Sequence, residues 1–600
     1  MNQPGTRRYT MRELVRVTHS LGFDFSPDGR RLVHISMRDG RYNLWAVPSS
    51  GGSPERLTAF REEAVREARW SSASGRVLFS TSGGDGKARL HLLDPDGNPA
   101  IRRLESDRAS ACDLHWAPDG ESAFFVAESK AGPDATDVVE YGIEAAASRT
   151  LATFHGEISL FPPSPDGRLL PVLEILAYAR PEGVLHLLDR ETGEARVFGD
   201  RETPSQHIPC GWSPDARTLY LSSNASSEHV RIEKIDVTSG RRDVVAEPPS
   251  DVISATCARD GGSIAYVANE RGRRHLVLRD IRTSSERLLA EGACEPLLFS
   301  PDGGRLLLCT QSAREADQFW VHEIGTGARA RLFGTLPDGI DPADLVEPVL
   351  TEFPGKGGKI SAAFYRPKGK GPFPCVMEIH GGPFSQAVPR YFWLHQHLLQ
   401  AGIAVFELNY RGSSGHGKTH ARALRGNWGE PDLEDVEAAA MHLRQDPEID
   451  PARIALHGTS YGGYLSLLAY GRLPGLWRAV AVGCGPANLA THFNALPSPW
   501  RRSVERDWGS LQDPAVRRRL EERSPLTHID RAQAPLFLWQ GGKDPIVSPQ
   551  EAEQVVEALR KRNVPVEYLL FPEVGHGFTK VEDRTRASEA VSGFLARHLA

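Results

Sequence analysis

The sequence predicts two domains of different fold class, an all-β domain followed by an α/β domain. Two observations carry this prediction. A turn signature built on Pro-Asp-Gly recurs with a nearly constant period over residues 22–334, and from residue 335 apolar strand-like runs alternate with helical ones. The chain of 600 residues is also too long for a single hydrophobic core. Its 25% charged and 40% hydrophobic residues are typical of a folded protein.

A short helix is predicted before the repeats begin. Over residues 10–21, the apolar residues Met11, Leu14, Val15 and Leu21 fall on one side of a helix. We expect the segment 1–21 to pack on the C-terminal domain.

The repeats predict a seven-bladed β-propeller over residues 22–334. Neighbouring copies of the turn lie about 42 to 49 residues apart, which is the period of a four-stranded propeller blade. Proline presets the first corner of each turn, aspartate bonds its own backbone, and glycine accepts a positive φ. A β-sandwich with fortuitous turns would not keep one period through seven copies. The copies are Phe25–Gly29, Trp70–Gly75, Trp116–Gly120, Pro163–Gly167, Trp212–Ala216, Cys257–Gly261 and Phe299–Gly303.

The C-terminal pattern predicts a mostly parallel sheet with helices on both faces. Pro337–Pro342 is the predicted linker, and the α/β domain is expected over residues 335–600. Strands are predicted at residues 359–365, 375–379, 404–409, 454–456, 479–482, 535–539 and 566–571. Helices are predicted at residues 433–444, directly after Ser460, at 549–561 and at the end of the chain.

Ser460 is the predicted nucleophile. It lies in Gly458-Thr-Ser460-Tyr-Gly462, between an apolar run that ends at Leu456 and a helical run that starts at Tyr464. A strand, a sharp turn and a helix are the context of a nucleophile elbow, in which the serine hydroxyl projects beyond the sheet. Because so short a motif also arises by chance, the prediction depends on partners elsewhere in the chain.

Asp544 is the predicted acid of a catalytic triad. It follows the buried strand predicted at residues 535–539. The competing role, capping the next helix, is already filled by Ser548, with Pro549 at the first helical position and Glu551 completing a capping box. Glu573 is the alternative acid.

His576 is the predicted base. It follows the last predicted strand, and its glycine neighbours on both sides leave the ring room to turn over a cleft. Thr579 and Glu582 have the spacing of a capping box for the last helix. The chain order of serine, acid and histidine is that of α/β-hydrolases, and this predicts the α/β-hydrolase fold for the domain.

Two backbone N–H groups are predicted to form an oxyanion hole. Tyr461, the residue after the nucleophile, supplies one donor. The other is expected from the loop after an early strand, which reads His380-Gly-Gly382-Pro383, and we assign it to Gly382. Each such donor stabilises the tetrahedral intermediate by roughly 3 to 4 kcal/mol.

Taken together, the motifs resemble those of the prolyl oligopeptidase family of serine peptidases, in its acylaminoacyl-peptidase and dipeptidyl-aminopeptidase-like branch. The resemblance covers nearly the whole chain. It implies cleavage of short peptides through an acyl-enzyme in a cavity between two domains, with the propeller excluding large folded proteins, and self-association. The motifs are His380–Pro383, Asn409–Gly415, Asn427–Gly429, Gly458–Tyr464, Ser524–Leu526, Asp544–Val547 and Gly575–Gly577.

Three departures from the family bear on the substrate. His380 stands where prolyl oligopeptidases carry a tyrosine whose hydroxyl completes the oxyanion hole, so the backbone must donate here. Ile546 stands where relatives often place Arg or Asn to hold a substrate carbonyl. Dipeptidyl peptidases bind the substrate amine with paired glutamates, and we interpret the one early pair, Glu62–Glu63, as a solvated loop pair. Strict dipeptidyl activity is therefore disfavoured.

Three functions follow from these residues. The leading one is a serine oligopeptidase or acylaminoacyl-peptidase-like enzyme acting on short peptides. The second is an amidase or esterase for a small aminoacyl compound such as an antibiotic, and the third is a non-catalytic propeller that binds proteins. Substrate-pocket walls are expected from the lid-like stretch 488–508 and from the residues after Asp544. The candidates are Phe493, Trp500, Trp508, Ile546 and Val547.

Composition excludes several other classes. A net charge of −6 argues against a nucleic-acid surface. The N-terminus does not have the apolar core of a signal peptide, and no run reaches the length of a membrane span. The seven cysteines are scattered without a C-x-x-C pair, so they predict neither a metal site nor a disulfide framework. We expect a cytoplasmic enzyme without a cofactor.

Overall fold

The computed structural model describes residues 7–83, 87–96, 100–104, 108, 110–132, 134–177 and 180–600. It divides the chain into two compact units. The β unit contains residues 18–310 and 317–335, and the α/β unit contains residues up to 17, 311–316 and 336–600. Residues 1–6, at the start of the predicted 1–21 segment, lie outside the described residues.

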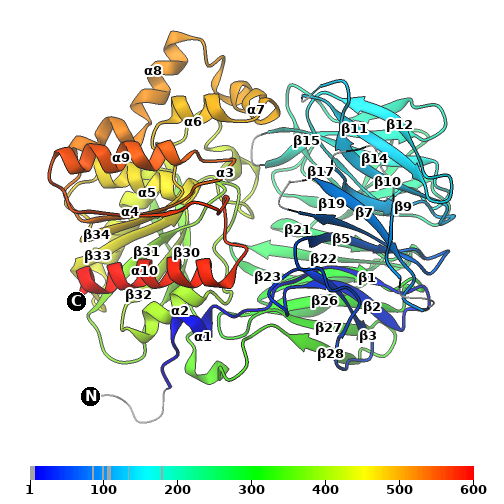
Figure 1. Cartoon of the computed structure of the whole chain (residues 1–600), viewed down its shortest axis with the longest axis horizontal. Coiled ribbons are helices and arrows are strands. Elements are labelled where there is room, and N and C mark those ends of the chain that lie inside the picture. The colour runs from blue at the N-terminus through cyan, green and yellow to red at the C-terminus, as the bar shows by residue number, and fades with distance from the viewer. Residues whose placement is uncertain are drawn as a thin grey trace. The chain divides into compact units, whose positions relative to one another are not determined.

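Five sheets of the β unit contain four antiparallel strands each (Figure 1). Within each sheet the strands follow one another in chain order. The first sheet is β1 (Ser20–Phe25), β2 (Arg31–Ser36), β3 (Asn43–Pro48) and β4 (Glu55–Arg56). The second is β5 (Ala64–Trp70), β6 (Val77–Ser82), β7 (Ala88–Leu93) and β8 (Arg102–Arg103). The third is β9 (Cys112–Trp116), β10 (Ser122–Glu128), β11 (Thr136–Gly142) and β12 (Ala147–Phe154). The last two are β21 (Asp251–Cys257), β22 (Ser263–Glu270), β23 (Arg273–Asp280) and β24 (Glu286–Glu291), and β25 (Ala293–Phe299), β26 (Arg305–Gln311), β27 (Gln318–Glu323) and β28 (Arg329–Gly334).

The remaining strands of the β unit form one eight-stranded sheet. Its first four strands are β13 (Glu157–Leu160), β14 (Leu169–Ala177), β15 (Arg180–Asp189) and β16 (Ala195–Phe198). Its other four are β17 (Ser205–Trp212), β18 (Thr218–Ser223), β19 (Arg231–Asp236) and β20 (Arg242–Ala246). The two halves pair only through β15 and β17, at Glu182 with Gln206 and Gly183 with Ser205.

The recurring turn has one local cause. In four copies a serine hydroxyl donates to the aspartate two residues later, at 2.5 to 2.6 Å: Ser26–Asp28, Ser164–Asp166, Ser213–Asp215 and Ser300–Asp302. The position after the aspartate has a positive φ in each copy. It is Gly29 (65°), Gly167 (74°), Ala216 (60°) and Gly303 (71°), and the alanine holds the same left-handed conformation as the glycines.

Acidic side chains join the first strands of consecutive sheets. Asp24 in β1 accepts a hydrogen bond from the Trp70 N–H at 2.8 Å. Glu67 in β5 accepts from the N–H groups of Asp113 and Leu114, both at 2.9 Å. Asp113 in β9 accepts from the Leu160 N–H at 2.9 Å. Each of these carboxylates therefore satisfies buried backbone donors of the sheet that follows it in the chain.

The α/β unit is built on one mixed sheet of eight strands, in the order β29-β30-β32-β31-β33-β34-β35-β36. The first two strands run antiparallel to their neighbours and the other six are parallel. This is the strand order of α/β-hydrolases. The strands are β29 (Val349–Gly355), β30 (Gly358–Tyr365), β31 (Phe373–Ile379), β32 (Ala404–Asn409), β33 (Ile449–Thr459), β34 (Ala479–Gly483), β35 (Leu536–Gly541) and β36 (Val566–Phe571).

Helices cover both faces of this sheet, as predicted (Figure 1). Helices α2 and α10 pack on one face, and α4, α5 and α9 on the other. The helices of the unit are α1 (Met11–Leu14), α2 (Trp393–Gln400), α3 (Lys418–Arg422), α4 (Pro431–Gln445), α5 (Tyr461–Arg472), α6 (Leu489–Ala495), α7 (Ser498–Trp508), α8 (Pro514–Glu522), α9 (Pro549–Lys561) and α10 (Val581–Leu599), with 3-10 turns at Pro342–Asp344 and Pro525–Arg531.

The helix predicted over residues 10–21 is wrong in length. It spans only Met11–Leu14, where Thr10 and Glu13 form a capping box. The chain then extends into β1, so Leu21 is a strand residue that is 41% exposed. The segment nevertheless binds within the α/β unit, because Tyr391 donates its hydroxyl proton to the Leu14 carbonyl at 2.9 Å and Arg584 donates to the Val15 carbonyl at 3.0 Å.

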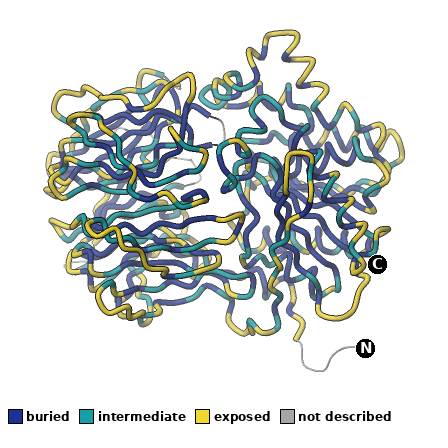
Figure 2. Tube along the Cα trace, turned by 180° about the vertical axis from the view of Figure 1, so that it is seen from behind, coloured by how far each residue is buried: buried dark blue, intermediate teal, exposed yellow. Residues whose placement is uncertain are grey.

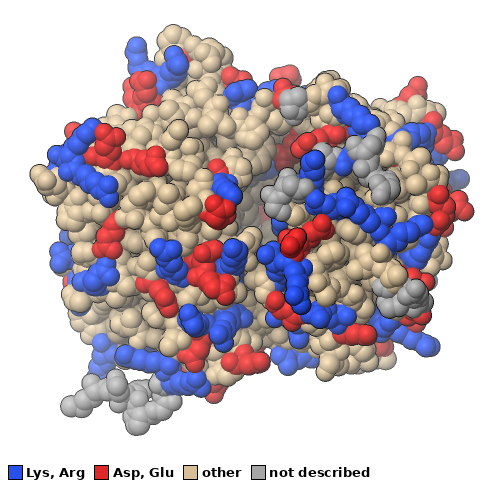
Figure 3. Space-filling model, viewed as in Figure 1, with Lys and Arg blue, Asp and Glu red and all other residues tan. Residues whose placement is uncertain are grey.

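The two units have similar distributions of buried residues and of surface charge. Buried residues lie along the strands and exposed ones at the turns (Figure 2). Positive and negative side chains are interspersed over the visible face of each unit (Figure 3), in keeping with the small net charge of −6. No helix within the described ranges has both the length and the apolar character needed to cross a bilayer.

Candidate active site

Ser460 lies at the sharp turn between β33 and α5. Its backbone has φ 60° and ψ −123°, a conformation that costs a non-glycine residue roughly 1–3 kcal/mol. Close packing holds the turn in place. A Cβ atom on Gly458 would lie 2.4 Å from the Gly462 carbonyl oxygen, and one on Gly462 would lie 1.9 Å from that of Ile379. Only glycine fits at these two positions, as a nucleophile elbow requires.

The structure brings Ser460, His576 and Asp544 into one hydrogen-bonded chain. His576 Nε2 lies 3.0 Å from Ser460 Oγ, and His576 Nδ1 lies 2.7 Å from Asp544 Oδ2. When Nδ1–H donates to the carboxylate, Nε2 is left to accept the serine proton. The three residues come from the ends of β33, β35 and β36, because parallel strands present their carboxyl ends at one edge of the sheet.

Asp544 is held by its own loop. Its Oδ1 atom accepts hydrogen bonds from the N–H groups of Ile546 and Val547, both at 2.9 Å. Burial opposes ionisation, but the hydrogen bonds from His576 and the two N–H groups lower the pKa of this carboxyl below its usual range. The carboxylate therefore stays charged beside the imidazole. Glu573, the alternative acid, is exposed and pairs with Lys543 Nζ at 2.5 Å.

The two predicted helix caps next to the triad differ from expectation. Ser548 does accept from the Gln550 N–H, but Glu551 does not complete a capping box. It accepts instead from the N–H groups of Ala487 and Asn488. The box predicted at Thr579 is absent, because α10 begins after Lys580 without a side-chain cap.

The loop after β31 lies directly against the elbow. A Cβ atom on Gly381 would be 3.4 Å from Ser460 Cβ, and Gly382, the next residue, has φ +128°. Tyr461 is the first residue of α5, where the N–H has no acceptor within the helix. The N–H groups predicted for the oxyanion hole thus belong to two segments that meet at the nucleophile.

His380 acts as a buried structural residue. Its Nε2 atom lies 2.8 Å from Ser413 Oγ, and its ring stacks on Tyr410 with centroids 4.4 Å apart. Burial lowers the pKa of the imidazole to about 4, which keeps it neutral. Tyr410 also donates its hydroxyl proton to the His380 carbonyl at 2.9 Å. These contacts fix the start of the loop that carries Gly382.

The predicted substrate-pocket residues differ in how far they are buried. Phe493 in α6 and Trp508 in α7 are buried, and Phe493 packs edge-on against Trp428. Trp500 is half-buried. Ile546 is half-buried and Val547 is 1% exposed, and it is their backbone that reaches the site, through Asp544.

Of the two adjacent glutamates in the β unit, Glu63 contacts other side chains and Glu62 is exposed. Glu63 accepts a hydrogen bond from Thr81 Oγ1 at 2.5 Å and lies 3.4 Å from Arg89 Nε. Glu62 is exposed. The two side chains therefore do not act as a free matched pair.

Cys484 is a neighbour of the triad that the sequence did not single out. Its thiol, Asp544 and His576 each place one possible ligand atom within 4.8 Å of the others. Burial raises the pKa of the thiol well above its usual range, and the other two members of the group, Asp544 and His576, are already hydrogen-bonded to each other. The site therefore fits proton transfer between His576 and its partners better than metal binding.

Comparison with known proteins identifies the domain that carries this site. Residues 389–600 match the prolyl oligopeptidase family. The chain carries a prolyl oligopeptidase family domain. Members of this family are serine peptidases, and the chain is an enzyme of the serine hydrolase class.

Relatives and solved structures agree with the family domain. Dipeptidyl aminopeptidase BIII of Pseudoxanthomonas mexicana is 27% identical over 96% of this chain and 86% of its own length. The human acylamino-acid-releasing enzyme is 33% identical over 39% of this chain and 32% of its own length. The crystal structure of a puromycin hydrolase, 22% identical, superposes on 99% of this chain and 96% of its own with a TM-score of 0.87. The last comparison supports the fold of the chain, with a hydrolase domain after an all-β domain.

Proposed function

We propose that this prolyl oligopeptidase family protein hydrolyses short peptides, as an oligopeptidase or an acylaminoacyl-peptidase-like enzyme. The observation that carries the proposal is the unbroken hydrogen-bonded chain from Ser460 through His576 to Asp544, at an elbow with positive φ. A serine hydroxyl is a weak nucleophile without a base, and a base needs a third group to hold its tautomer. All three parts are in contact here.

The proposed reaction has two steps. His576 Nε2 takes the Ser460 proton as Oγ attacks the substrate carbonyl carbon, and the N–H groups of Tyr461 and Gly382 receive the negative oxygen. The imidazolium, stabilised by Asp544, then gives the proton to the leaving amine. Water, activated by the same imidazole, attacks the acyl-enzyme and releases the acid product, which regenerates the Ser460 hydroxyl.

In this proposal the β unit is a seven-bladed propeller over residues 22–334, and the segment 1–21 packs on the hydrolase domain at 335–600. Seven sets of four consecutive strands support it, if the eight-stranded sheet is divided at the short β15–β17 contact. We expect the propeller to restrict access to small substrates. Cleavage of a short peptide, but not of the same sequence within a stably folded protein, would test this role.

The central experiment is the Ser460→Ala variant. We expect it to lose turnover of chromogenic aminoacyl and peptide substrates while keeping its circular dichroism spectrum. Wild-type protein should be labelled by a fluorophosphonate probe, and the variant should not. Ser510→Ala changes an exposed serine and should label normally. Retained turnover in Ser460→Ala would contradict the proposal, and an unlabelled wild type would favour the non-catalytic, protein-binding function.

Ile546 favours a second candidate function, an amidase or esterase for a small aminoacyl compound. Its half-buried side chain carries no donor for a peptide carbonyl at the position two residues after the acid. The engaged Glu63 likewise offers no matched partner for a dipeptide amine. A panel of matched peptides, aminoacyl amides and aminoacyl esters separates the two functions. A clear preference for peptides would remove the second.

A further inference from the structure

Charged and ionisable side chains cross the centre of the parallel sheet in the α/β unit. Glu378 in β31 pairs in register with Glu407 in β32 on one side and with His457 in β33 on the other. All three residues are buried, at 8%, 4% and 4% exposure. Strands at the centre of a parallel sheet are normally apolar throughout, because helices cover both faces. A buried polar row therefore requires a specific cause.

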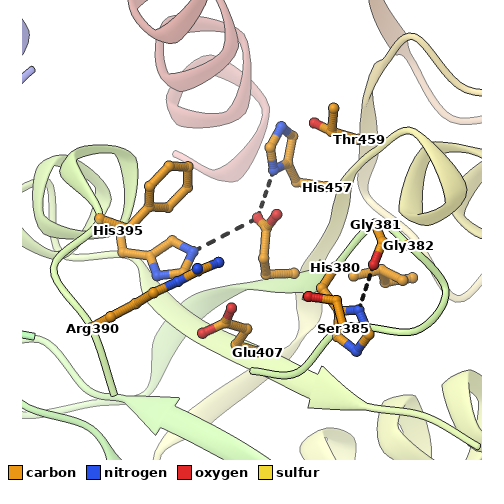
Figure 4. Close-up of a pocket in the computed structure, with 12 residues that line it drawn as sticks. His380, Gly381, Gly382, Ser385, Arg390, His395, Glu407, His457 and Thr459 are labelled. Atoms are coloured by element: carbon orange, nitrogen blue, oxygen red, sulfur yellow. Dashed lines mark hydrogen bonds and ion pairs between the residues drawn. The ribbon is translucent and has the colours of Figure 1, made fainter. Parts of the chain in front are cut away.

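These residues line a cavity of about 330 Å³, and Thr459, the residue before the nucleophile, lies on its wall (Figure 4). His395 of α2 faces the row, and Glu378 lies between His395 and His457 in Figure 4. Thr459, Gly381 and Gly382 also line the cavity. The cavity thus shares a wall with the elbow and with the proposed oxyanion loop, and every lining residue belongs to the α/β unit.

Several buried polar atoms around this cavity are unsatisfied among the described residues. Glu407 Oε2 and both ring nitrogens of His395 have no hydrogen-bond partner. Such atoms cost about 1–3 kcal/mol each when they stay unpaired, and more when they are charged. At the cavity wall these atoms are available to a polar group that enters the cavity.

The charges indicate what enters. Burial opposes ionisation of Glu378, but the hydrogen bond to His457 and the positive field of His457 and His395 lower its pKa to about 2, so it is a carboxylate. His457 Nδ1 lies 2.6 Å from Glu378 Oε2, whereas His395 Nε2 is 3.9 Å away. Burial raises the pKa of Glu407, which has no such donor. Glu407 therefore presents a buried oxygen, Oε2, to which no described group donates a hydrogen bond, and a cation at this oxygen would favour the carboxylate form.

We propose that this cavity is a cation subsite, which takes the alkylammonium or guanidinium group of a substrate residue that flanks the cleaved bond. The inference rests on the proposed peptidase function. His457 stands three residues before Ser460 in β33, on the order of 10 Å along the strand, a separation suited to a long basic side chain. Thr459 and Gly382, which line the cavity, are the residue before the nucleophile and the proposed oxyanion donor.

Two other occupants fit less well. Among the described residues, the group that gathers three metal-ligand atoms within 4.8 Å is the one at Cys484, and not this one, which favours a larger organic cation over a bare metal ion. An anionic group would meet Arg390, an exposed residue of the lining, but would also meet the carboxylates of Glu378 and Glu407. Arg390 is instead a competing cation at the same cavity.

The test uses pairs of fluorogenic peptides that differ only in lysine or norleucine next to the cleaved bond. One pair places this residue on the acyl side and another on the leaving-group side, so the two arms identify which side the cavity serves. In one arm we expect kcat/KM for lysine to exceed that for norleucine by about tenfold, the size of one hydrogen bond to a charged group. Glu407→Gln should reduce this ratio to about one, chiefly through KM, whereas Glu437→Gln, which removes a surface charge, should leave it unchanged.

Arg390→Gln tests the same cavity in the opposite direction. Removal of the competing cation should increase the lysine preference, and this result does not depend on how well Glu407→Gln folds. Equal rates for lysine and norleucine in both arms, a preference for glutamate at this position, or an unchanged ratio in both variants would overturn the proposal. Turnover of the neutral norleucine peptides tests the peptidase function separately, so its failure is distinguished from failure of the subsite.

Discussion

The hydroxyl of Tyr461 donates a hydrogen bond of 2.6 Å to the carboxylate of Asp432, which is fully buried at the start of α4. The N–H groups of Gly429 and Leu433 donate to the other carboxylate oxygen. The residue next to the nucleophile is thereby attached to a second helix. Burial nevertheless dominates these bonds and raises the pKa of Asp432 to about 7.

This pKa predicts how stability changes with pH. An unfolded aspartate titrates near pH 3.9, roughly three units lower. Between pH 3.9 and about 7, Asp432 is protonated in the folded protein but ionised in the unfolded chain. The stability that the protonated Asp432 contributes is therefore fully present at low pH and is lost as pH rises through about 7. We expect Asp432→Asn to remove this loss. Its melting temperature relative to wild type should be higher at pH 8 than at pH 5.

Asp450 supplies a control of opposite sign. The hydrogen bond from Arg453 and that from the Ala452 N–H lower the pKa of this carboxyl, so its contribution is lost as pH falls instead. Asp450→Asn should therefore lose stability relative to wild type at neutral pH, and this deficit should narrow toward pH 3. A difference in melting temperature between Asp432→Asn and wild type that stays constant from pH 5 to pH 8 would show that Asp432 is ionised throughout that range.

Asp544 and Glu573 can be separated by matched amide substitutions. In Asp544→Asn the amide would face His576 Nδ1, which stabilises the wrong tautomer, and kcat should fall by roughly 10³ to 10⁴-fold. Glu573→Gln changes an exposed carboxylate that pairs with Lys543, and kcat should stay within a factor of about two, as for surface substitutions. The reverse pattern would assign the acid to Glu573.

The packing of the elbow predicts different results for two glycines near the triad. A Cβ atom on Gly462 would meet the backbone oxygens of Ile379 and His380 at 1.9 and 2.8 Å. Gly462→Ala should therefore push the oxyanion loop away from Ser460 and lower both kcat and the melting temperature. A Cβ atom on Gly577 would meet nothing within 4 Å. Comparable losses in Gly577→Ala would show that the effect is not one of packing.

The hydrogen bonds of Glu67 to the next sheet predict how much this contact stabilises the β unit. Glu67→Ala would leave the N–H groups of Asp113 and Leu114 without their acceptor, at a cost of about 1–3 kcal/mol for each buried group. We expect a lower denaturation midpoint for the β unit, measured by tryptophan fluorescence in urea. Glu121→Ala removes an exposed glutamate of the same unit and should have little effect. Equal midpoints for the two variants would contradict the role of Glu67.

Most strands could be predicted because turn chemistry and apolar runs are local signals. The strand at Ala404–Asn409 and the helix at Pro549–Lys561 agree with the sequence prediction at both ends. The prediction of a helix over residues 10–21 failed because Leu21, in β1, pairs with Ile35 of the neighbouring strand β2, a partner that local periodicity does not reveal. The capping role of Glu551 failed for a similar reason, since its acceptor oxygens serve a segment more than sixty residues earlier.

In the candidate site too, some residues could be predicted from the sequence and others could not. The sequence order of Ser460, Asp544 and His576 was informative, and the structure places their side chains in contact, while their catalytic roles stay predictions. The pocket residues were less predictable, because an aromatic side chain such as Phe493 gives the same pattern in a core as in a binding site. Glu378 and Glu407 were overlooked, since each is a polar residue that follows an apolar run within its strand. Only the register of neighbouring strands aligns them.

The attachment of the first residues to the last helix has a consequence for how the protein is made. Tyr9 and Leu14 pack with Ile340, Leu345 and Tyr391, and the Val15 carbonyl binds Arg584 of α10. On the ribosome these apolar side chains emerge long before their partners are translated, so the hydrolase core closes only once α10 has been made. A shortened fragment that starts at the linker would expose this patch permanently, and we expect such a fragment to aggregate unless the leading peptide is supplied in trans.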